Sequence, residues 1–202
     1  GPTQKLIVIY GIASAMLYLH SLDIIHRDLT LKNVLLNKFL FPKLCDFGLS
    51  IQISQKNDEN EDIYGTPGYI APESYRFAKY SKASDVYSFA ILLFILLSRI
   101  NPYEKLYPQN IMHEVAFRNN RPDKTEEIDA NYWDLIKRCW SEDPKDRPTF
   151  NEIVDELVNE KFTKNVNVDL FMKYVSFIKE QNKLPDNFEK FFLKKSKNSN
   201  DD

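Results

Sequence analysis

Three polar side chains near the start of the chain have the chemistry of a catalytic site. Asp28 and Asn33 lie in the stretch IIHRDLTLKNVLL at residues 24–36, and Asp46 opens the triplet DFG eighteen residues after Asp28. A carboxylate can accept a proton, and carboxylate and amide oxygens are ligands that Mg²⁺ prefers. An isolated aspartate or asparagine in a loop more commonly caps a helix or a turn. The surrounding pattern therefore has to decide between these interpretations.

Further motifs follow in order: GTPGYIAPE at residues 65–73, then SDVYSF, and later CWSEDPKDRPTF. The ordered HRD, DFG and APE motifs resemble the signature of the eukaryotic protein kinases. The downstream stretches are most similar to the tyrosine-kinase-like group of serine/threonine kinases. The resemblance covers residues 4–160 and implies a protein-kinase-like C-lobe that transfers the γ-phosphate of ATP to a protein hydroxyl.

The resemblance implies roles for five residues around the reacting groups. Asp28 is the base that orients the attacking hydroxyl and accepts its proton, and Asn33 with Asp46 holds Mg²⁺. Leu35 packs against the adenine ring of ATP. Cys45 has two interpretations: a small buried apolar residue, which we prefer, or a thiol that faces the nucleotide pocket. The expected cofactors are ATP and Mg²⁺, and the expected partner is a protein substrate.

Other residues match structural positions of the family. His26 and Phe47 are expected to stack in an internal hydrophobic spine that Asp85 anchors, so His26 is structural and not a proton shuttle. Glu73 and Arg147 match a buried ion pair that joins the activation segment to the late helices. Removing one partner of such a pair is expected to cost several kcal/mol, on the order of 3–5.

A regulatory role follows for Arg27, which stands beside the catalytic aspartate. In the family such an arginine pairs with a phosphorylated residue of the activation segment and orders it. The candidates are Ser50, Ser54, Tyr64 and Thr66. Thr66 has a competing catalytic role, because the corresponding threonine contacts the catalytic aspartate. Ser54 and Tyr64 are the favoured switch residues.

The catalytic loop departs from the serine/threonine kinase pattern at one position. Thr30 stands two residues after Asp28, where a lysine that steadies the transferred phosphate is usual. Lys32 stands where many tyrosine kinases place a basic residue with that function, so the lysine is predicted to be relocated. Thr66-Pro67 is a serine/threonine feature. Serine/threonine specificity is therefore favoured, and tyrosine or dual specificity stays open.

The elements that position these residues can also be predicted. Apolar residues at helical spacing predict a helix over residues 4–20 with one apolar face. Two brief strands are expected to flank the catalytic loop, and residues 41–44 form a third strand after the turn-like Asn37-Lys38. Residues 50–64 are polar, acidic in the middle and without strong periodicity, which indicates a mobile loop.

The second half of the chain is predicted to be helical. The stretch 84–98 is apolar almost all round and is typical of a central helix. Further helices are expected near 110–118 and 131–140, from a capping box at Thr149 to Val158, and over 169–181. The predicted fold is mainly α (α+β overall), with residues 1–160 as the kinase C-lobe. Residues 161–202 form a C-terminal extension, helical at first, whose end from Lys194 frays.

Composition excludes several other classes of protein. The 202 residues are 43% hydrophobic and 28% charged, and the net charge of −2 gives no long-range attraction to nucleic acid or to an anionic membrane. The two cysteines lack metal-ligand spacing, which fits a reducing, cytoplasmic setting. No signal peptide is expected, and the longest apolar run, residues 89–97, is shorter than the ~20 residues of a membrane span. Lysines 194, 195 and 197 are interpreted as a solvated end.

The motifs of the small kinase lobe are missing from this sequence. No GxGxxG loop and no VAIK-like lysine precede the HRD motif. The chain is therefore expected to be a C-lobe that works with an N-lobe or upstream domains of a parent chain, and to bind ATP poorly alone. The alternative is a truncated, pseudokinase-like lobe that serves as a protein-binding scaffold. Intact Asp28, Asn33 and Asp46 favour the enzyme.

Overall fold

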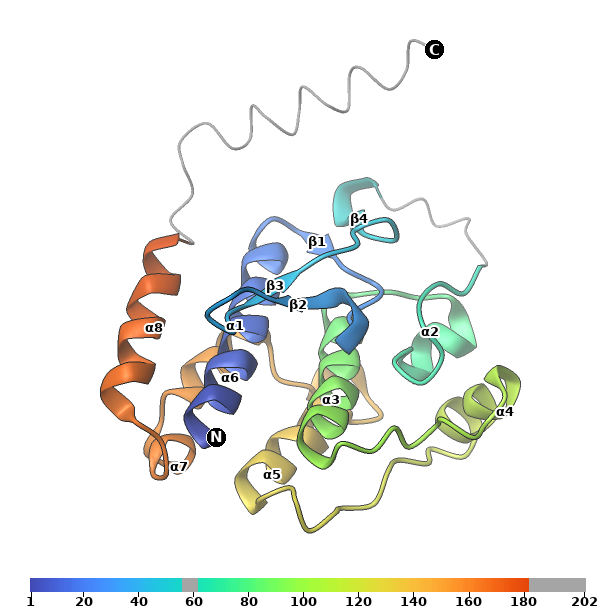
Figure 1. The fold of residues 1–202 in the computed structure, drawn as a ribbon. Coiled ribbons are helices and arrows are strands. Elements are labelled where there is room, and N and C mark those ends of the chain that lie inside the picture. Colours follow the sequence, from blue (N-terminus) through green and yellow to red (C-terminus); the bar gives the residue numbers. More distant parts are fainter. Residues whose placement is uncertain (56–61, 182–202) are drawn as a thin grey trace.

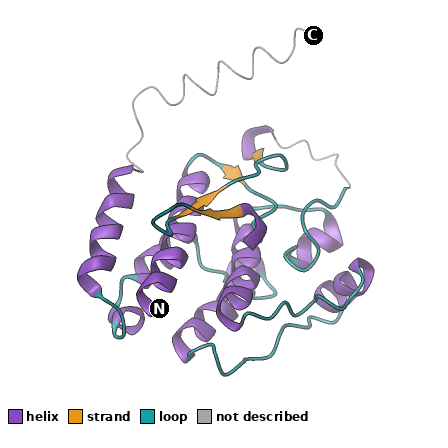
Figure 2. Cartoon of the chain, in the orientation of Figure 1, coloured by secondary structure: helices purple, strands orange, loops and turns teal. Residues whose placement is uncertain are grey.

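The computed structural model describes residues 1–55 and 62–181 (Figure 1). The acidic centre of the predicted mobile loop and the predicted fraying end from Lys194 lie outside these residues. The described part is mainly helical, with two small two-stranded sheets on one side (Figure 2). This arrangement confirms the predicted fold class. None of the described helices is long and apolar enough to cross a membrane.

Two long helices form the centre of the molecule. Helix α1 spans Pro2–Ser21, and α3 spans Lys82–Ser98 with a capping box between Ser81 and Ser84 at its start. Helix α3 is buried along most of its length, as its apolar sequence predicts. The remaining helices surround this pair: α2 (Pro72–Phe77), α4 (Pro108–Met112), α5 (Ala130–Cys139), α6 (Phe150–Leu157), α7 (Glu160–Thr163) and α8 (Val168–Gln181).

The prediction of a single apolar face for the first helix is wrong. Residues Leu6 to Ser14 of α1 are all buried, which covers more than two full turns. The reason is that α1 has neighbours on several sides. It packs against α6, α8 and β3 (Pro42–Leu44), three elements that come later in the chain.

The strands predicted around the catalytic loop are present, but they do not pair with each other. Strand β1 (Ile24–Ile25) pairs antiparallel with β4 (Ile51–Gln52). Strand β2 (Val34–Leu36) pairs with β3, with Leu35 opposite Lys43. The catalytic loop therefore connects two separate sheets. Strand β4 and the 3₁₀ turn η2 (Ile53–Gln55) also occupy part of the predicted mobile loop.

The turn of the β2–β3 hairpin is built around Asn37. The Asn37 side-chain oxygen accepts hydrogen bonds from the backbone N–H of Phe39 (2.8 Å) and Phe41 (3.0 Å), a local pattern that favours turns. Leu40 takes a left-handed backbone conformation, with φ of 62°. The predicted turn at Asn37-Lys38 is confirmed.

Side-chain caps begin two helices of the second half, α5 and α6. The Asp129 carboxylate accepts hydrogen bonds from two backbone N–H groups at the start of α5, and Thr149 with Glu152 forms the predicted capping box of α6. Helix α4 continues into one turn of π-helix, η3 (His113–Phe117). The predicted helices near 110–118 and 131–140 and over 169–181 are thus confirmed, within about two residues at their ends.

Candidate active site

The Asp28 carboxylate joins the HRDLTLKN and GTPGYIAPE motifs at one point. Its Oδ1 accepts two hydrogen bonds from Thr66, one from the backbone N–H (2.9 Å) and one from the hydroxyl (2.7 Å). Its Oδ2 accepts a hydrogen bond from the Asn33 side-chain amide (3.0 Å). The predicted contact of Thr66 with the aspartate is present. These three donors fix the orientation of a half-buried carboxylate.

A second aspartate holds the backbone of the catalytic loop. Asp85 is 1% exposed in the first turn of α3. Its two oxygens accept hydrogen bonds from the backbone N–H of His26 (2.9 Å) and of Arg27 (3.0 Å), and the His20 ring lies 2.9 Å from Oδ2. Arg27 has a φ of 65°, a conformation that these bonds help to hold. The predicted anchoring contact of Asp85 with the loop is therefore present.

Asn33 and Asp46 lie at the open end of the β2–β3 hairpin. The Asn33 amide nitrogen donates to both the backbone and the side chain of Asp28, which leaves its Oδ1 for a cation. Asp46 is exposed, and its carboxylate accepts one long hydrogen bond from the Gly48 backbone (3.3 Å). The Cys45 N–H donates to the Asn33 carbonyl (2.9 Å) and ties the two sides together.

This donor set fits Mg²⁺. It offers one amide oxygen and one carboxylate, both hard ligands, and Mg²⁺ usually takes its other ligands from water and substrate phosphates. Among the described residues, no cluster of three or more His, Cys, Asp or Glu side chains could hold a metal ion. Asn33 and Asp46 therefore stay the predicted pair of metal ligands.

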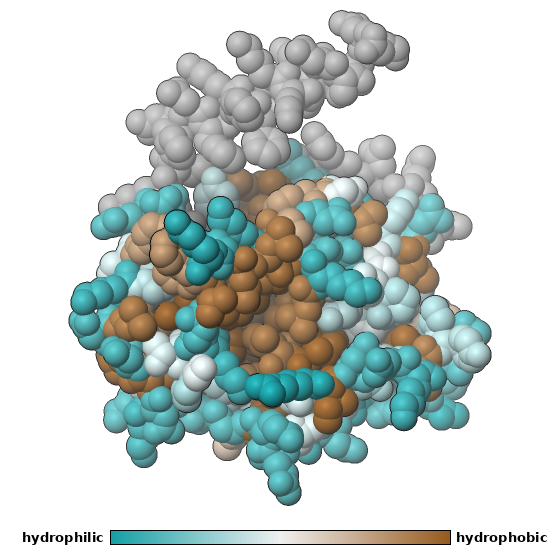
Figure 3. Space-filling view, viewed as in Figure 1, coloured by the Kyte–Doolittle hydropathy of each residue, from teal (hydrophilic) through white to brown (hydrophobic). Residues whose placement is uncertain are grey.

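The surface beside these ligands is apolar and open. Figure 3 shows apolar residues covering a hollowed central area in the region of the hairpin, α1 and α3. Leu35, the central residue of β2, is 57% exposed, so its side chain is free to contact a ring. Cys45 is half-exposed, which makes the preferred interpretation of a buried small residue wrong. Its position at the hairpin's open end, and not in the core, is the reason.

The predicted stack of His26 and Phe47 is present, but it is not fully internal. The ring centroids are 5.2 Å apart with the rings tilted by 51°. His26 is completely buried, whereas Phe47 is 47% exposed. Because about half of the Phe47 side chain is exposed, the prediction of an internal spine is wrong at this residue.

The two residues at the unusual position of the loop differ in exposure. Thr30 is 2% exposed and thus directed away from solvent. Lys32 lies in the 3₁₀ turn η1 (Leu31–Asn33), is exposed, and makes no hydrogen bond or ion pair with the residues that the structure describes. Of the two, only Lys32 presents its side chain to solvent. The relocation of the lysine stays a prediction.

Arg27 lies between Tyr64 of the activation segment and Tyr80, which follows α2. Its guanidinium carbon is 4.6 Å from the centroid of the Tyr64 ring and 5.4 Å from that of Tyr80, and its Nε donates to the Leu49 carbonyl. Burial lowers the pKa of Arg27 from its usual value, although the tyrosines and Asp85 act in the opposite direction. Ser54, the other favoured switch residue, is exposed in η2 and is not among the described contacts of Arg27.

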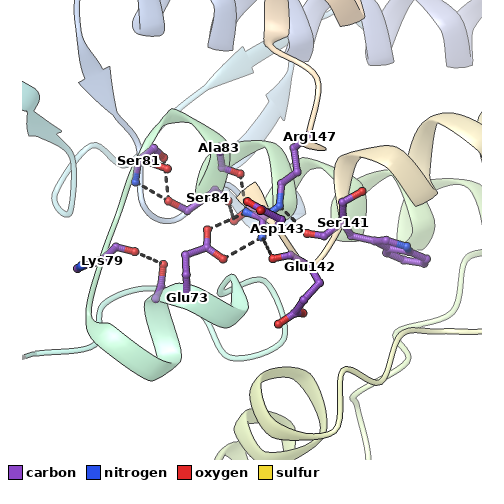
Figure 4. A network of polar contacts seen from close by, with 12 residues as sticks. Glu73, Lys79, Ser81, Ala83, Ser84, Ser141, Glu142, Asp143 and Arg147 are labelled. Atoms are coloured by element: carbon purple, nitrogen blue, oxygen red, sulfur yellow. Dashed lines mark hydrogen bonds and ion pairs between the residues drawn. The ribbon is translucent and has the colours of Figure 1, made fainter. Parts of the chain in front are cut away.

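The predicted ion pair of Glu73 and Arg147 is present and bidentate. The two N–O distances are 2.7 and 2.8 Å, and the Arg147 side chain is fully buried. Its guanidinium also donates to the carbonyls of Ala83 (3.0 Å) and Ser141 (2.8 Å) (Figure 4). This network joins α2, which ends the activation segment, to α3 and to the segment before α6.

Neither His20 nor Tyr80 is among the residues predicted from sequence. His20 contacts Asp85 from the end of α1, and Tyr80 exchanges hydrogen bonds with the backbone of Tyr64, donating to its carbonyl at 2.9 Å. The available signal for His20 is a histidine at the end of a largely apolar helix. The sequence has eleven tyrosines, and nothing in it distinguishes Tyr80 from the other ten.

The fold and this site define a protein kinase catalytic loop, and comparison with known proteins agrees. Residues 1–157 match the family described as protein tyrosine and serine/threonine kinase. The chain belongs to this family. Helix α8 lies beyond the matched residues.

Three relatives illustrate the similarity. The serine/threonine/tyrosine-protein kinase HT1 of Arabidopsis thaliana is 39% identical over 155 residues, 74% of this chain and 40% of HT1. The RGS domain-containing serine/threonine-protein kinase A of Dictyostelium discoideum is 38% identical over 151 residues, 75% of this chain and 13% of that protein. The dual specificity protein kinase pyk3 of the same organism is 32% identical over 185 residues, 92% of this chain and 13% of pyk3. The chain thus spans less than half of each relative.

Proposed function

We propose that this chain is the catalytic C-lobe of a serine/threonine protein kinase that transfers the γ-phosphate of ATP to a protein hydroxyl. The observation that carries the proposal is the set of hydrogen bonds from Thr66 and Asn33 to Asp28. These bonds fix the orientation of the Asp28 carboxylate in the catalytic loop. The residue stays half-buried, so a substrate can still reach it. A solvated loop aspartate without catalytic use would not need three fixed donors.

In this proposal each residue contributes positioning or charge. Asp28 orients the substrate hydroxyl and accepts its proton. Asn33 and Asp46 would hold Mg²⁺, which when bound neutralises charge on the phosphate oxygens. Lys32 steadies the transferred phosphate in place of a lysine at position 30. Leu35 offers an apolar surface to the adenine ring, and Cys45 borders the same open end of the hairpin.

Serine/threonine specificity is supported by two observations. The names of the relatives are those of serine/threonine or dual specificity kinases. Thr66-Pro67 follows the serine/threonine pattern, and the Thr66 hydroxyl donates a hydrogen bond to Asp28. The downstream motifs support placement in the tyrosine-kinase-like group, and the charge and cysteine usage support a cytoplasmic protein.

Tyr64 is the proposed phosphorylation switch. Its ring already lies against Arg27, so a phosphate there would add two negative charges beside a partly buried guanidinium. Ser54 is kept as the second candidate. Replacing both residues by alanine should reduce activation of the enzyme, and unchanged activity would remove the proposal.

Phosphoamino-acid analysis tests the function as a whole. The natural polypeptide that carries residues 1–202 is incubated with labelled ATP, Mg²⁺ and a mixed acceptor protein, and we expect label on serine and threonine. Asp46→Asn should abolish the label, whereas the control Asp123→Asn, at an exposed aspartate, should keep it. If neither serine nor threonine is labelled and the polypeptide still binds other proteins, the scaffold alternative is favoured.

A further inference from the structure

Helix α8 packs on the catalytic unit although it lies beyond the residues of the family match. Phe171 and Tyr174 on one face of α8 are 0% and 3% exposed. The Tyr10 ring of α1 lies 5.5 Å from the Phe171 ring and 6.3 Å from the Tyr174 ring, centroid to centroid. The Asn167 N–H just before α8 donates to the Thr3 hydroxyl (2.9 Å). The helix is thus an integral part of the fold.

The same face of α8 reaches the β2–β3 hairpin. The Phe41 ring lies 4.6 Å from the Tyr174 ring and 6.0 Å from the Phe177 ring. Figure 1 shows the turn of the hairpin directed toward α8. At Gly11 of α1, an added Cβ would lie 2.3 Å from the Tyr174 hydroxyl and 2.5 Å from Pro42 Cγ. Three elements, α1, α8 and β3, therefore meet where there is no room for a side chain.

This hairpin carries both predicted metal ligands. Asn33 immediately precedes β2, and Asp46 follows β3 by two residues. Leu35 is the central residue of β2, and the Cys45–Asn33 backbone bond closes the open end of the hairpin. A movement of the hairpin relative to α1 would therefore change the positions of Asn33 and Asp46 relative to the catalytic loop.

We infer that α8 is a positioning element for the metal and nucleotide site, with Tyr174 and Phe177 holding the hairpin against α1. The inference rests on the proposed function, because Asn33 and Asp46 are metal ligands only if the chain is a kinase lobe. Tyr174 and Phe177 touch no reacting group. They act through Phe41 and the hairpin.

The ring of Tyr174, and not its hydroxyl, makes the contacts that matter. The hydroxyl is buried and has no hydrogen-bond partner among the described residues. Removing it in Tyr174→Phe should leave the packing unchanged, because no hydrogen bond is lost. Tyr174→Phe is therefore a matched control for Tyr174→Ala.

The test compares Tyr174→Ala and Phe177→Ala with two controls, Tyr174→Phe and Met172→Ala, on the 202-residue chain. Met172 lies on the same helix and is 41% exposed, close to the 45% of Phe177, so it controls for the loss of an exposed apolar side chain of α8. Hydrogen exchange is followed at the Cys45 amide, which bonds across the hairpin's end, and at amides of α3. We expect both alanine variants to speed exchange at Cys45 about tenfold, with α3 unchanged, and both controls to match the wild type.

A second readout follows the metal site directly. Paramagnetic broadening of the Asn33 and Asp46 signals by Mn²⁺ detects even millimolar binding. The apparent Kd for Mn²⁺ should rise about tenfold in the alanine variants, the size of effect usual for residues that orient metal ligands. A role in stability alone would speed exchange throughout the chain and would not single out the hairpin.

The possible outcomes separate this inference from the function on which it rests. Selective loosening of the hairpin with weaker Mn²⁺ binding supports the inference. Uniform loosening, no loosening, or selective loosening with unchanged Mn²⁺ affinity overturns it. If the wild-type chain binds no Mn²⁺ at Asn33 and Asp46 while the hairpin still loosens selectively, the proposed function fails at its metal site, and the positioning role fails with it.

Discussion

Thr66 links the activation segment directly to the predicted catalytic aspartate. It places two donors on one oxygen of Asp28. Replacing it by alanine removes the hydroxyl donor and keeps the backbone donor. A hydrogen bond to a charged group contributes about 1.5–3 kcal/mol, so Thr66→Ala should lower kcat on the order of ten- to a hundredfold. Steady-state kinetics measures this, and Thr66→Ser, which keeps the hydroxyl, should remain near the wild type. Equal losses in both variants would refute the assignment.

A substitution of Lys32 tests whether this residue takes the function of the lysine that is usual at position 30. Lys32→Ala should reduce kcat at least tenfold, because it removes a charge that acts on the transferred phosphate. The free energy of unfolding should not change, since the side chain is exposed. Lys105→Ala, at another exposed lysine, is the control for a general effect of charge. Turnover that survives Lys32→Ala would mean that another group performs this function.

The two cysteines should differ in reactivity. Cys45 is half-exposed, whereas Cys139 is fully buried and burial raises the pKa of its thiol. The thiolate is the reactive form, so a maleimide should label Cys45 at least about tenfold faster than Cys139 in the folded chain. Mass spectrometry of the digested protein gives both rates. Equal rates in the native state, or faster labelling of Cys139, would contradict the described burial.

At the scale of elements, the Glu73–Arg147 pair connects α2 with the segment before α6. Glu73→Ala would leave a fully buried guanidinium without its carboxylate. Such a loss costs about 3–5 kcal/mol, which chemical denaturation should detect as a lower free energy of unfolding. Glu104→Ala, at an exposed glutamate, should change stability by no more than about 0.5 kcal/mol. If both variants unfold at the same denaturant concentration, the pair has no structural role.

Local elements could be predicted because their signals are local. The capping box at Thr149 and the turn at Asn37 each depend on residues within a few positions of one another. The strand pairing could not be predicted in this way, since β1 meets β4 across the 25 intervening residues 26–50 and the local pattern does not identify the partner strand. The burial of residues 6–14 of α1 on all sides likewise depends on α6 and α8, which lie far along the chain.

At the scale of the whole molecule, the sequence predicts which site residues contact one another better than it predicts how far each is buried. The motifs identify Asp28, Asn33 and Thr66 as one site, and their hydrogen bonds are present. The exposed fractions of the Phe47 and Cys45 side chains depend on how the hairpin packs on the helices. Such surface properties follow from the full packing arrangement, which short motifs do not contain.

The central claim is that Asp28 is the base of a phosphoryl-transfer site. It is tested most directly by the single-turnover rate of phosphate transfer from ATP to a protein acceptor, measured for the natural polypeptide that carries this chain and for its Asp28→Asn variant. Asparagine keeps the size of the side chain and can still accept the Thr66 hydrogen bonds, but it cannot take up the proton. We predict that the rate falls on the order of 10²–10⁴-fold while the fold is retained. A variant rate within about twofold of the wild type would contradict the assignment of Asp28 as the base.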